Sequence, residues 1–207
     1  KVAEVVQGSN VKRAAQDGHW ENRGACTGKV GADMLKEIGV EYVIIGHSEQ
    51  RTYFGETDAT VNKKVRKVQS LDMTPIICIG ETLAERKDGR LESVLTTQVN
   101  GAYEGLAADD ALRTFIAYEP VWAIGTGVTA SDDEAQQAHA FVRSLLAIRY
   151  GEDVAQSISI QYGGSMKPEN AAGLLAQTDI DGGLIGGAAL KADSFLGIVT
   201  PGESISK

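Results

Sequence analysis

Glu119 is the side chain in this sequence best placed for acid–base chemistry. It directly follows the apolar run of residues 114–118, which predicts a buried strand. A carboxylate at the end of a buried strand lies in a partly dry environment, where it can act as a general base. A solvated acid at a strand end is an equally common alternative, and Glu119 alone does not distinguish the two.

The segment after Glu119 favours the catalytic alternative because it has the composition of a lid. Pro120 stiffens the first hinge, and Gly-Thr-Gly at residues 125–127 frees the second. Between them, Val-Trp-Ala-Ile at residues 121–124 forms an apolar tip, which surface loops seldom carry. Such a segment suits closure over a ligand with exclusion of water. The predicted lid consists of Pro120, Val121, Trp122, Ala123, Ile124, Gly125, Thr126 and Gly127.

His47 is a second candidate, because it directly follows the apolar run of residues 42–45 and begins a Ser-Glu turn that contains Glu49. Backbone N–H groups in such a turn favour the neutral imidazole, which can donate a hydrogen bond to a carbonyl oxygen. A lone histidine is more often a hydrogen-bonded core residue. His19 and His139 lack this setting, and His139 is expected on the surface of a helix.

Two glycine turns, each between a predicted strand and a helix, suit the binding of an anion. They are Gly163-Gly164-Ser165 and Gly186-Gly187. Glycine lets backbone N–H groups approach an anion closely, and a following helix N-terminus adds its dipole. Turn geometry alone also explains glycine here. Two such turns after consecutive strands match the phosphate site that barrels build after their seventh and eighth strands.

Six strand–helix units are predicted to position these residues. One helix carries Val61, Val65 and Val68 opposite a basic face that includes Lys64, and another begins with a capping box at residues 131–134. Strands that alternate with helices predict a parallel sheet. The predicted strands are short apolar runs at residues 10–15, 42–45, 74–79, 114–118, 157–162 and 183–185.

The fold class is therefore α/β, either a doubly wound open sheet or a (β/α)8 barrel. An open sheet concentrates its ligand contacts at one switch point, whereas a barrel gathers the ends of all its strands around one mouth. Reactive residues or glycine turns follow nearly every predicted strand, which favours the barrel. Since no composition shift marks a second domain, residues 1–207 are expected to form a single (β/α) barrel domain that is N-terminally incomplete.

Composition limits the possible partners and compartments. The formal net charge of -8 disfavours nucleic acid and anionic membranes. Neither Cys26 nor Cys78 belongs to a C-x-x-C pair and there are only three histidines, so no metal site is predicted. This cysteine usage is typical of a reducing compartment, and we expect a cytoplasmic protein.

Several segments resemble the signature segments of triosephosphate isomerase, and they occur in that family's order. They are residues 46–49, 117–127, 161–165 and 181–188, with residues 78–82 fitting between the first two. The resemblance runs from about Ser9 to about Val199. It implies a (β/α)8 barrel with six of its eight units present in this sequence. It also implies a homodimer, contacted through a long loop at residues 16–29 that contains Thr27.

The resemblance also implies a reaction in glycolysis and gluconeogenesis. Glu119 would move a proton between two carbons of dihydroxyacetone phosphate, giving D-glyceraldehyde 3-phosphate through an enediolate. His47 would polarise the carbonyl, Glu49 would order the site, and the lid would exclude water. The family is itself a standard example of a glutamate base paired with a neutral histidine. No cofactor or metal is needed. The phosphate would be bound by Gly125, Ser165, Gly186 and Gly187.

The sequence departs from the family at its N-terminal end. The family's first strand carries N-x-K, whose lysine contacts the substrate, and this sequence has no match for that lysine. Asn10-Val11-Lys12 has the spacing, but the residues after it fit the third strand and its loop. Cys26 replaces an aromatic residue at the loop tip, and Gln50 replaces an arginine that often follows the Ser-Glu pair.

Two alternatives to an active isomerase remain at this point. One is a catalytically inactive barrel fragment that retains phosphate binding and dimer contacts. The other is a different phosphate-binding barrel enzyme, which the lid together with His47 and Glu119 disfavours. We expect the missing strands to belong to the natural molecule, because strands that are apolar on both faces need neighbours on both sides.

Overall fold

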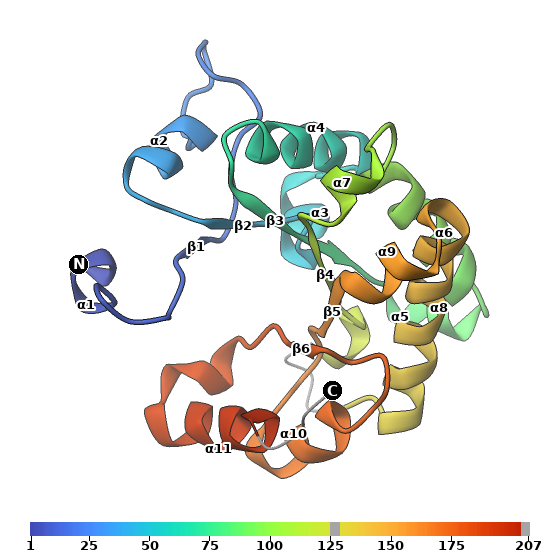
Figure 1. Ribbon diagram of the computed structural model, residues 1–207. Helices are drawn as coiled ribbons and strands as arrows, with labels where there is room; N and C mark the ends of the chain where they lie inside the picture. Colours follow the sequence, from blue (N-terminus) through green and yellow to red (C-terminus); the bar gives the residue numbers. More distant parts are fainter. Residues whose placement is uncertain (125–128, 204–207) are drawn as a thin grey trace. The chain divides into compact units, whose positions relative to one another are not determined.

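The computed structural model describes residues 1–124 and 129–203 (Figure 1). Strands and helices alternate along the chain, and the strand order is that of the chain, β1-β2-β3-β4-β5-β6. The predicted α/β class with six strand–helix units is confirmed. The chain divides into two compact units, which are described separately below. Unit 1 comprises residues 1–78 and 100–115, and unit 2 comprises residues 79–99 and the described residues from 116 onward.

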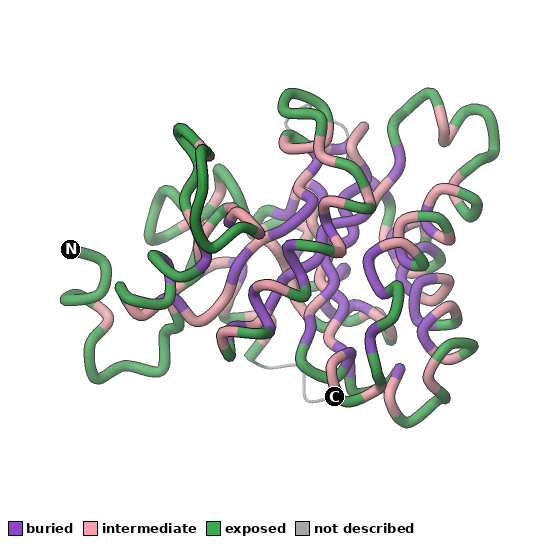
Figure 2. The backbone as a smooth tube through the Cα atoms, turned by 90° about the horizontal axis from the view of Figure 1, so that it is seen from above, coloured by how far each residue is buried: buried purple, intermediate pink, exposed green. Residues whose placement is uncertain are grey.

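Unit 1 is built on three parallel strands. β1 (Ala14–Ala15) pairs with β2 (Tyr42–Ile45), which pairs with β3 (Thr74–Ile79). Val43 and Ile77 are fully buried in these strands. Figure 2 colours the backbone by burial, with buried residues in purple. The helices of unit 1 are α1 (Val2–Val5), α2 (Ala32–Glu37), α3 (Ser48–Phe54), α4 (Asp58–Gln69) and α7 (Ala108–Ala111).

Helix α4 packs as predicted except at Lys64. Val61, Val65 and Val68 form its buried stripe, and a capping box at Thr57 fixes its start. Lys64 was expected on the basic outer face, but it is buried, with its ammonium paired to Asp17. A hydrophobic pattern cannot identify a buried lysine, because burial depends on acidic partners that lie elsewhere in the chain.

Unit 2 carries β4 (Phe115–Tyr118), β5 (Ser159–Tyr162) and β6 (Gly182–Gly183), and β5 pairs with β6 in parallel. Its longest helix, α8 (Asp132–Tyr150), begins at the predicted capping box of Ser131 and Glu134. α6 (Leu91–Ala102) runs from unit 2 into unit 1. The remaining elements are α5 (Leu83–Lys87), η1 (Val121–Ala123), α9 (Glu152–Ser157), α10 (Pro168–Leu175), η2 (Gly187–Leu190) and α11 (Ala192–Glu203).

The predicted strands at residues 42–45 and 74–79 have the predicted bounds, whereas the other four are shorter than predicted. Of residues 10–15 only Ala14 and Ala15 pair; Val11 is 57% exposed and Lys12 forms a surface ion pair with Glu41. The last strand is residues 182–183, because β5 ends at Tyr162 and offers no further ladder partner.

His139 lies in the core of unit 2, so the prediction of a surface position is wrong. Its ring centroid lies 5.6 Å from that of Tyr118 and 6.2 Å from that of Tyr162. Its Nδ1 lies 3.1 Å from the carbonyl oxygen of Asp179. Burial lowers the pKa of His139 to about 4, so the imidazole is neutral.

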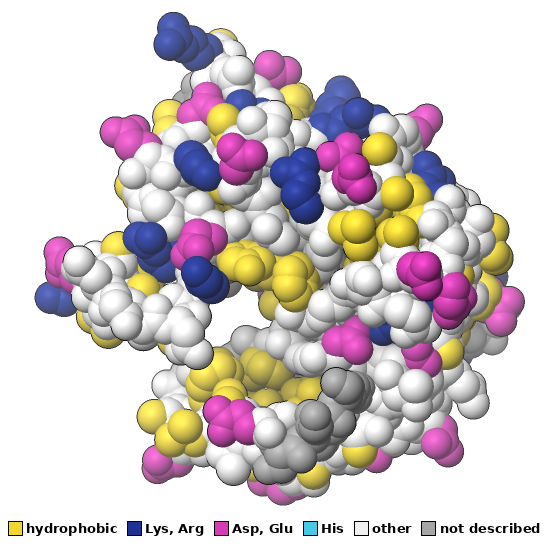
Figure 3. Space-filling model, in the orientation of Figure 1, with side chains coloured by type: hydrophobic (Ala, Val, Ile, Leu, Met, Phe, Trp, Pro, Cys, Tyr) yellow, Lys and Arg dark blue, Asp and Glu magenta, His cyan; other side chains and the backbone are white. Residues whose placement is uncertain are grey.

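Unit 2 also contains an apolar cavity of about 520 Å³ beside β6 and α11. Met166, Ile180, Phe195 and Ile198 contribute to its lining, and Figure 3 shows hydrophobic side chains gathered on this part of the unit. None of the predicted site residues lines it, so it is not the candidate site. In residues 1–124 and 129–203, no helix has both the length and the apolarity that a bilayer crossing requires.

Candidate active site

Glu119 follows β4 in unit 2 and is only 2% exposed, as expected for an acid at the end of a buried strand. Hydrogen bonds hold the main chain here on both sides. The Glu119 N–H donates to the Ile79 carbonyl over 2.7 Å, and the Gly163 N–H donates to the Tyr118 carbonyl over 2.7 Å. The carboxylate therefore starts from a fixed backbone position.

Two glycines leave the space that Glu119 occupies. A Cβ atom on Gly80 would lie 1.8 Å from the Glu119 carbonyl oxygen, and a Cβ atom on Gly163 would lie 2.8 Å from the Glu119 Cγ. At both distances Glu119 would have to shift to admit a Cβ atom. Gly163 is thus required by its approach to Glu119, and the turn after β5 is part of the setting of this acid.

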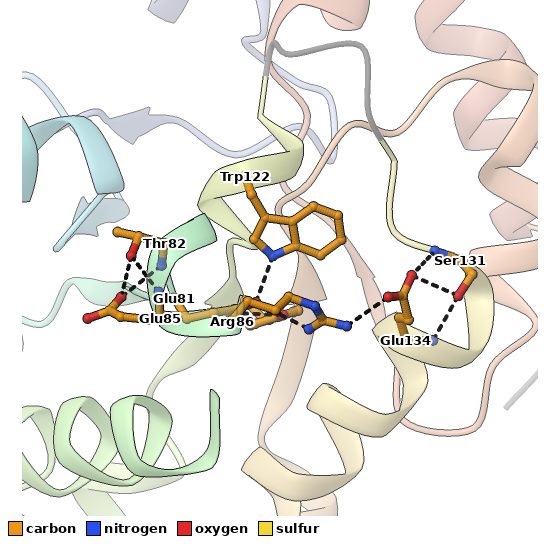
Figure 4. Close-up of polar contacts among 8 residues, drawn as sticks. Glu81, Thr82, Glu85, Arg86, Trp122, Ser131 and Glu134 are labelled. Carbon is orange, nitrogen blue, oxygen red and sulfur yellow. Dashed lines mark hydrogen bonds and ion pairs between the residues drawn. The ribbon is translucent and has the colours of Figure 1, made fainter. Parts of the chain in front are cut away.

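A buried carboxylate, Glu81, connects the turn after β3 to the segment after Glu119 (Figure 4). Trp122 Nε1–H donates to its Oε1 over 2.7 Å, and the Tyr118 hydroxyl donates to its Oε2 over 3.0 Å. Arg86 Nη1 lies 3.3 Å from the same Oε1, and Arg86 lies over the Trp122 ring. Burial raises the pKa of Tyr118 well above its ordinary range and the charge of Glu81 raises it further, so this hydroxyl remains a donor.

These contacts hold the first part of the predicted lid. Val121 N–H donates to the Glu81 carbonyl over 3.1 Å, and η1 begins directly after Pro120. The Ala123 carbonyl accepts from the Ser165 N–H over 3.1 Å, which joins this segment to the turn after β5. The three remaining predicted lid residues, Gly125, Thr126 and Gly127, lie outside the described residues, as does the predicted phosphate contact of Gly125.

His47 lies in unit 1 between β2 and α3, and its side chain is 27% exposed. Its ring serves as the N-cap of α3, because Nδ1 accepts the Glu49 N–H over 3.3 Å. A nitrogen that accepts carries no proton, so in this geometry the proton of the neutral ring is on Nε2. Glu49 is 67% exposed, and its Oε2 lies 3.9 Å from Nδ1. This ring can donate from Nε2 to a carbonyl oxygen.

The glycines of the two predicted phosphate turns differ in their surroundings. Gly186 and Gly187 are exposed, and a Cβ on either would meet nothing within 4 Å, so their backbone is open to a ligand. Gly164 is explained by packing, because its Cβ would lie 2.3 Å from the Tyr162 hydroxyl. Ser165 is half-buried, and its N–H is occupied by Ala123.

The predicted site residues are therefore divided between the units. Unit 2 contains Glu119, the described lid residues and the two glycine turns, whereas unit 1 contains His47 and Glu49. Thr27, in the predicted dimer loop, is an exposed residue of unit 1. Within the described residues no group of His, Cys, Asp and Glu side chains could hold a metal ion.

Comparison with known proteins decides the family. A family model described as triosephosphate isomerase matches residues 1–201. The chain belongs to the triosephosphate isomerase family. The resemblance drawn from the signature segments is thus confirmed, and with it the TIM barrel as the fold class of this chain.

Curated members of the triosephosphate isomerase family are similar over nearly the whole chain. The triosephosphate isomerase of Alkaliphilus oremlandii is 53% identical over 199 residues, which are 96% of this chain and 80% of the relative. That of Fusobacterium nucleatum is 54% identical over 96% of this chain and 79% of the relative. That of Chlorobium phaeovibrioides is 54% identical over 96% of this chain and 78% of the relative.

Sequence reasoning assigned no role to Glu81. The residue pair Gly80-Glu81 follows an apolar strand, which is the position that marked Glu119 and His47. Its partners Tyr118 and Trp122, however, lie 37 and 41 residues further along the chain. Only the folded chain shows that this acid binds the lid segment.

Proposed function

We propose that this protein is an isomerase that interconverts dihydroxyacetone phosphate and D-glyceraldehyde 3-phosphate, with Glu119 as its base. The observation that carries the proposal is the buried Glu119 carboxylate, positioned by Gly80 and Gly163 next to a segment that Glu81 holds through Trp122. Membership of the triosephosphate isomerase family supports the same reaction. Proton transfer next to a carbonyl requires a base of this kind and a donor to the carbonyl oxygen.

The reaction needs two protein groups to handle protons. Glu119 removes a proton from C1 of dihydroxyacetone phosphate while the Nε2–H of His47 donates to the carbonyl oxygen on C2. The electron pair of the broken C–H bond forms the C1–C2 double bond of the enediolate. His47 moves the proton of the hydroxyl on C1 to the oxygen on C2. Glu119 then returns its proton to C2, so that the oxygen on C1 becomes the aldehyde and the oxygen on C2 a hydroxyl. The hydrogen bond to Nδ1 of His47 supports its role, because it leaves the ring proton on Nε2.

The other residues bind the substrate and exclude water. Gly125, Ser165, Gly186 and Gly187 hold the phosphate, with the open backbone at Gly186 and Gly187 in support. Glu49 orders the turn that carries His47. Residues 120–127 close over the substrate and keep water from the enediolate, and their apolar tip supports this role.

The protein works as a homodimer in the cytoplasm, as part of glycolysis and gluconeogenesis. The exposed loop of residues 16–29, with Thr27 near its tip, contacts the partner subunit. Cys26 and Cys78 are not joined by a disulfide, in keeping with a reducing compartment.

A coupled assay with D-glyceraldehyde 3-phosphate tests the proposed function, on protein whose intact mass has been verified. The unmodified chain is expected to turn over, and Glu119→Gln is expected to lose at least about a thousandfold in kcat, in the upper range for removal of a positioned base. Glu92→Gln, a change to an exposed acid on α6, is the matched control and should retain activity. Turnover of another sugar phosphate alone would contradict the proposal, as would full activity of Glu119→Gln.

A further inference from the structure

Gly46, the residue that precedes His47, has both its backbone N–H and its carbonyl held by charged side chains. The Gly46 N–H donates to Glu56 Oε2 over 2.9 Å, and the Gly46 carbonyl accepts from Arg51 Nε over 2.9 Å. Both bonds involve an ionised partner, which makes them stronger than ordinary hydrogen bonds. The backbone of Gly46, directly before His47, is thus fixed on both sides.

Gly46 needs this conformation, and only glycine fits it. Its φ is +78°, and an added Cβ would lie 3.0 Å from the Cys78 carbonyl oxygen and 3.0 Å from Val61 Cγ2. The left-handed conformation turns the chain out of β2 and into the turn that carries His47. A fixed turn at Gly46 therefore sets the direction in which the imidazole leaves the backbone.

Arg51 reaches beyond Gly46 to the strand beside it. Nη1 pairs with Asp58 at the start of α4 over 2.7 Å, and Nη2 donates to the Cys78 carbonyl over 3.3 Å. The planar guanidinium serves three acceptors at once, which a lysine ammonium on a flexible stem cannot reproduce. Arg51 is thus suited to fix geometry and not merely to supply charge.

Glu56 is held in turn by Lys64, the lysine that unexpectedly lies inside the unit. The side chains of Glu56 and Lys64 are 4% and 7% exposed and form an ion pair, and Lys64 also pairs with Asp17 over 2.6 Å. Burial of such charges is weak evidence for stability, because desolvation opposes their attraction. Their presence beside Gly46 is better explained by a need to hold the Glu56 carboxylate in one place.

We propose that Arg51 and Glu56 are positioning residues for His47, acting through the Gly46 peptide so that the Nε2–H of the imidazole points at the substrate carbonyl. This role rests on the proposed function of His47. We call the hydrogen bonds that Arg51 and Glu56 make with the backbone of Gly46 the clamp. Its role differs from plain stabilisation, because loss of the clamp redirects the His47 ring while the unit stays folded. Misplacement of a reacting group by about 1 Å costs up to about a hundredfold in rate.

The test compares Arg51→Lys and Glu56→Gln with Lys67→Gln in the full chain. Lys67 lies on α4, the helix that carries Asp58 and Lys64, and pairs with Asp33 over 3.0 Å, so its change removes another ion pair of that helix. For each protein we would measure kcat and KM with glyceraldehyde 3-phosphate, the urea midpoint, and the ¹⁵N resonances of the His47 ring. Using two clamp variants keeps the test decisive if one of them fails to fold.

Both clamp variants are expected to lose at least about tenfold in kcat with less than about threefold change in KM, and to shift the His47 resonances. Lys67→Gln should change neither kcat nor the His47 resonances. A folded clamp variant with the parent's kcat and unshifted His47 resonances would overturn the proposal, as would equal effects in Lys67→Gln. If the parent chain has no turnover, the proposed function fails, and the His47 resonances alone then decide whether the clamp positions the ring.

Discussion

Trp122 donates its indole N–H to Glu81 over 2.7 Å, and this carboxylate has no exposed surface. The bond joins the segment directly after the candidate base to the turn that follows β3. A buried carboxylate that loses a donor keeps its desolvation cost, so the contact should matter both to stability and to the lid.

Trp122→Phe should therefore weaken both properties. The ring remains apolar, but among the described residues Glu81 would keep the side chains of Tyr118 and Arg86 as its polar partners. We expect a loss of roughly 1–3 kcal/mol in the free energy of unfolding, as for a hydrogen bond to a charged group. We also expect a lower kcat, because the lid would no longer start from a fixed position. Urea unfolding would measure the change in the free energy of unfolding, and the coupled assay would measure kcat.

Trp20→Phe is the matched control, since it removes the chain's other indole, which is half-buried in unit 1 with its ring centroid 4.2 Å from that of His19. It should reduce the free energy of unfolding less than Trp122→Phe does, because phenylalanine keeps the ring contact and no buried carboxylate loses a donor. A loss as large as that of Trp122→Phe would mean that the Glu81 bond has no special weight.

His139 should make the protein less stable in mild acid. Its folded pKa of about 4 lies below its ordinary value of 6.5 because of burial. The unfolded chain therefore binds a proton that the folded chain does not, and stability is lost as the pH falls from 6.5 toward 4. Between pH 7.5 and pH 5 this histidine should account for a loss of about 2 kcal/mol.

Urea unfolding at both pH values, for the parent chain and for His139→Gln, would measure this contribution. The variant should be less stable at pH 7.5 but should lose less on acidification. An identical pH dependence in the two proteins would contradict the assignment.

Arg143→Met should destabilise the fold more than any surface ion-pair mutation. Arg143 is 6% exposed and pairs with Asp179 over 2.6 Å and with Asp181 over 2.7 Å. It also donates to the carbonyls of Ala155 and Ile158. Removal of the cation leaves two partly buried acids without their partner, at a cost of about 3–5 kcal/mol.

The exposed pair of Arg113 and Asp110 offers the comparison for that mutation. Arg113→Met should cost at most about 1 kcal/mol, because exposed pairs are screened by water. Chemical denaturation of both variants would establish the ranking. Equal losses in the free energy of unfolding would show that burial of Arg143 with Asp179 and Asp181 does not determine their contribution to stability.

Gly163→Ala tests whether the turn after β5 positions Glu119. The new methyl group would lie 2.8 Å from the Glu119 Cγ and 3.2 Å from the Tyr118 carbonyl oxygen, so the carboxylate has to move. We expect kcat to fall by roughly ten- to a hundredfold. Gly31→Ala is the control, since its Cβ would meet only the Glu21 carbonyl oxygen at 3.8 Å. Parent-like kcat in a folded Gly163→Ala protein would show that Glu119 tolerates the displacement.

The parts of the fold that the sequence predicted best are those in which one segment carries its own signal. β2 is apolar, as is β3 after Thr74, and both were predicted with the observed bounds. The capping box of α8 depends on two residues three positions apart, and it too was predicted. Glu119 was recognised because the strand before it and the lid segment after it are adjacent in the chain.

The errors concern polar residues whose partners are distant in the sequence. His139 follows the buried stripe of α8, but its hydrogen-bond partner Asp179 is 40 residues away. Lys64 is buried because Asp17, 47 residues earlier, meets its ammonium. Helical periodicity identifies the apolar residues of a buried helix face. It cannot distinguish a buried polar residue that has a partner from a polar residue in water, because the two look alike in the sequence.

The central claim is that Glu119 moves the proton, and isomerisation in D₂O tests it most directly. Glyceraldehyde 3-phosphate would be converted by the parent chain, by Glu119→Gln and by Glu92→Gln, with the product followed by proton NMR. The account predicts dihydroxyacetone phosphate from the parent chain and from Glu92→Gln. This product carries hydrogen at C1 where Glu119 returns the proton it removed, and a single deuterium at C1 where that proton first exchanges with solvent. The account predicts no product above background from Glu119→Gln. Product from Glu119→Gln at the parent's rate would contradict the account.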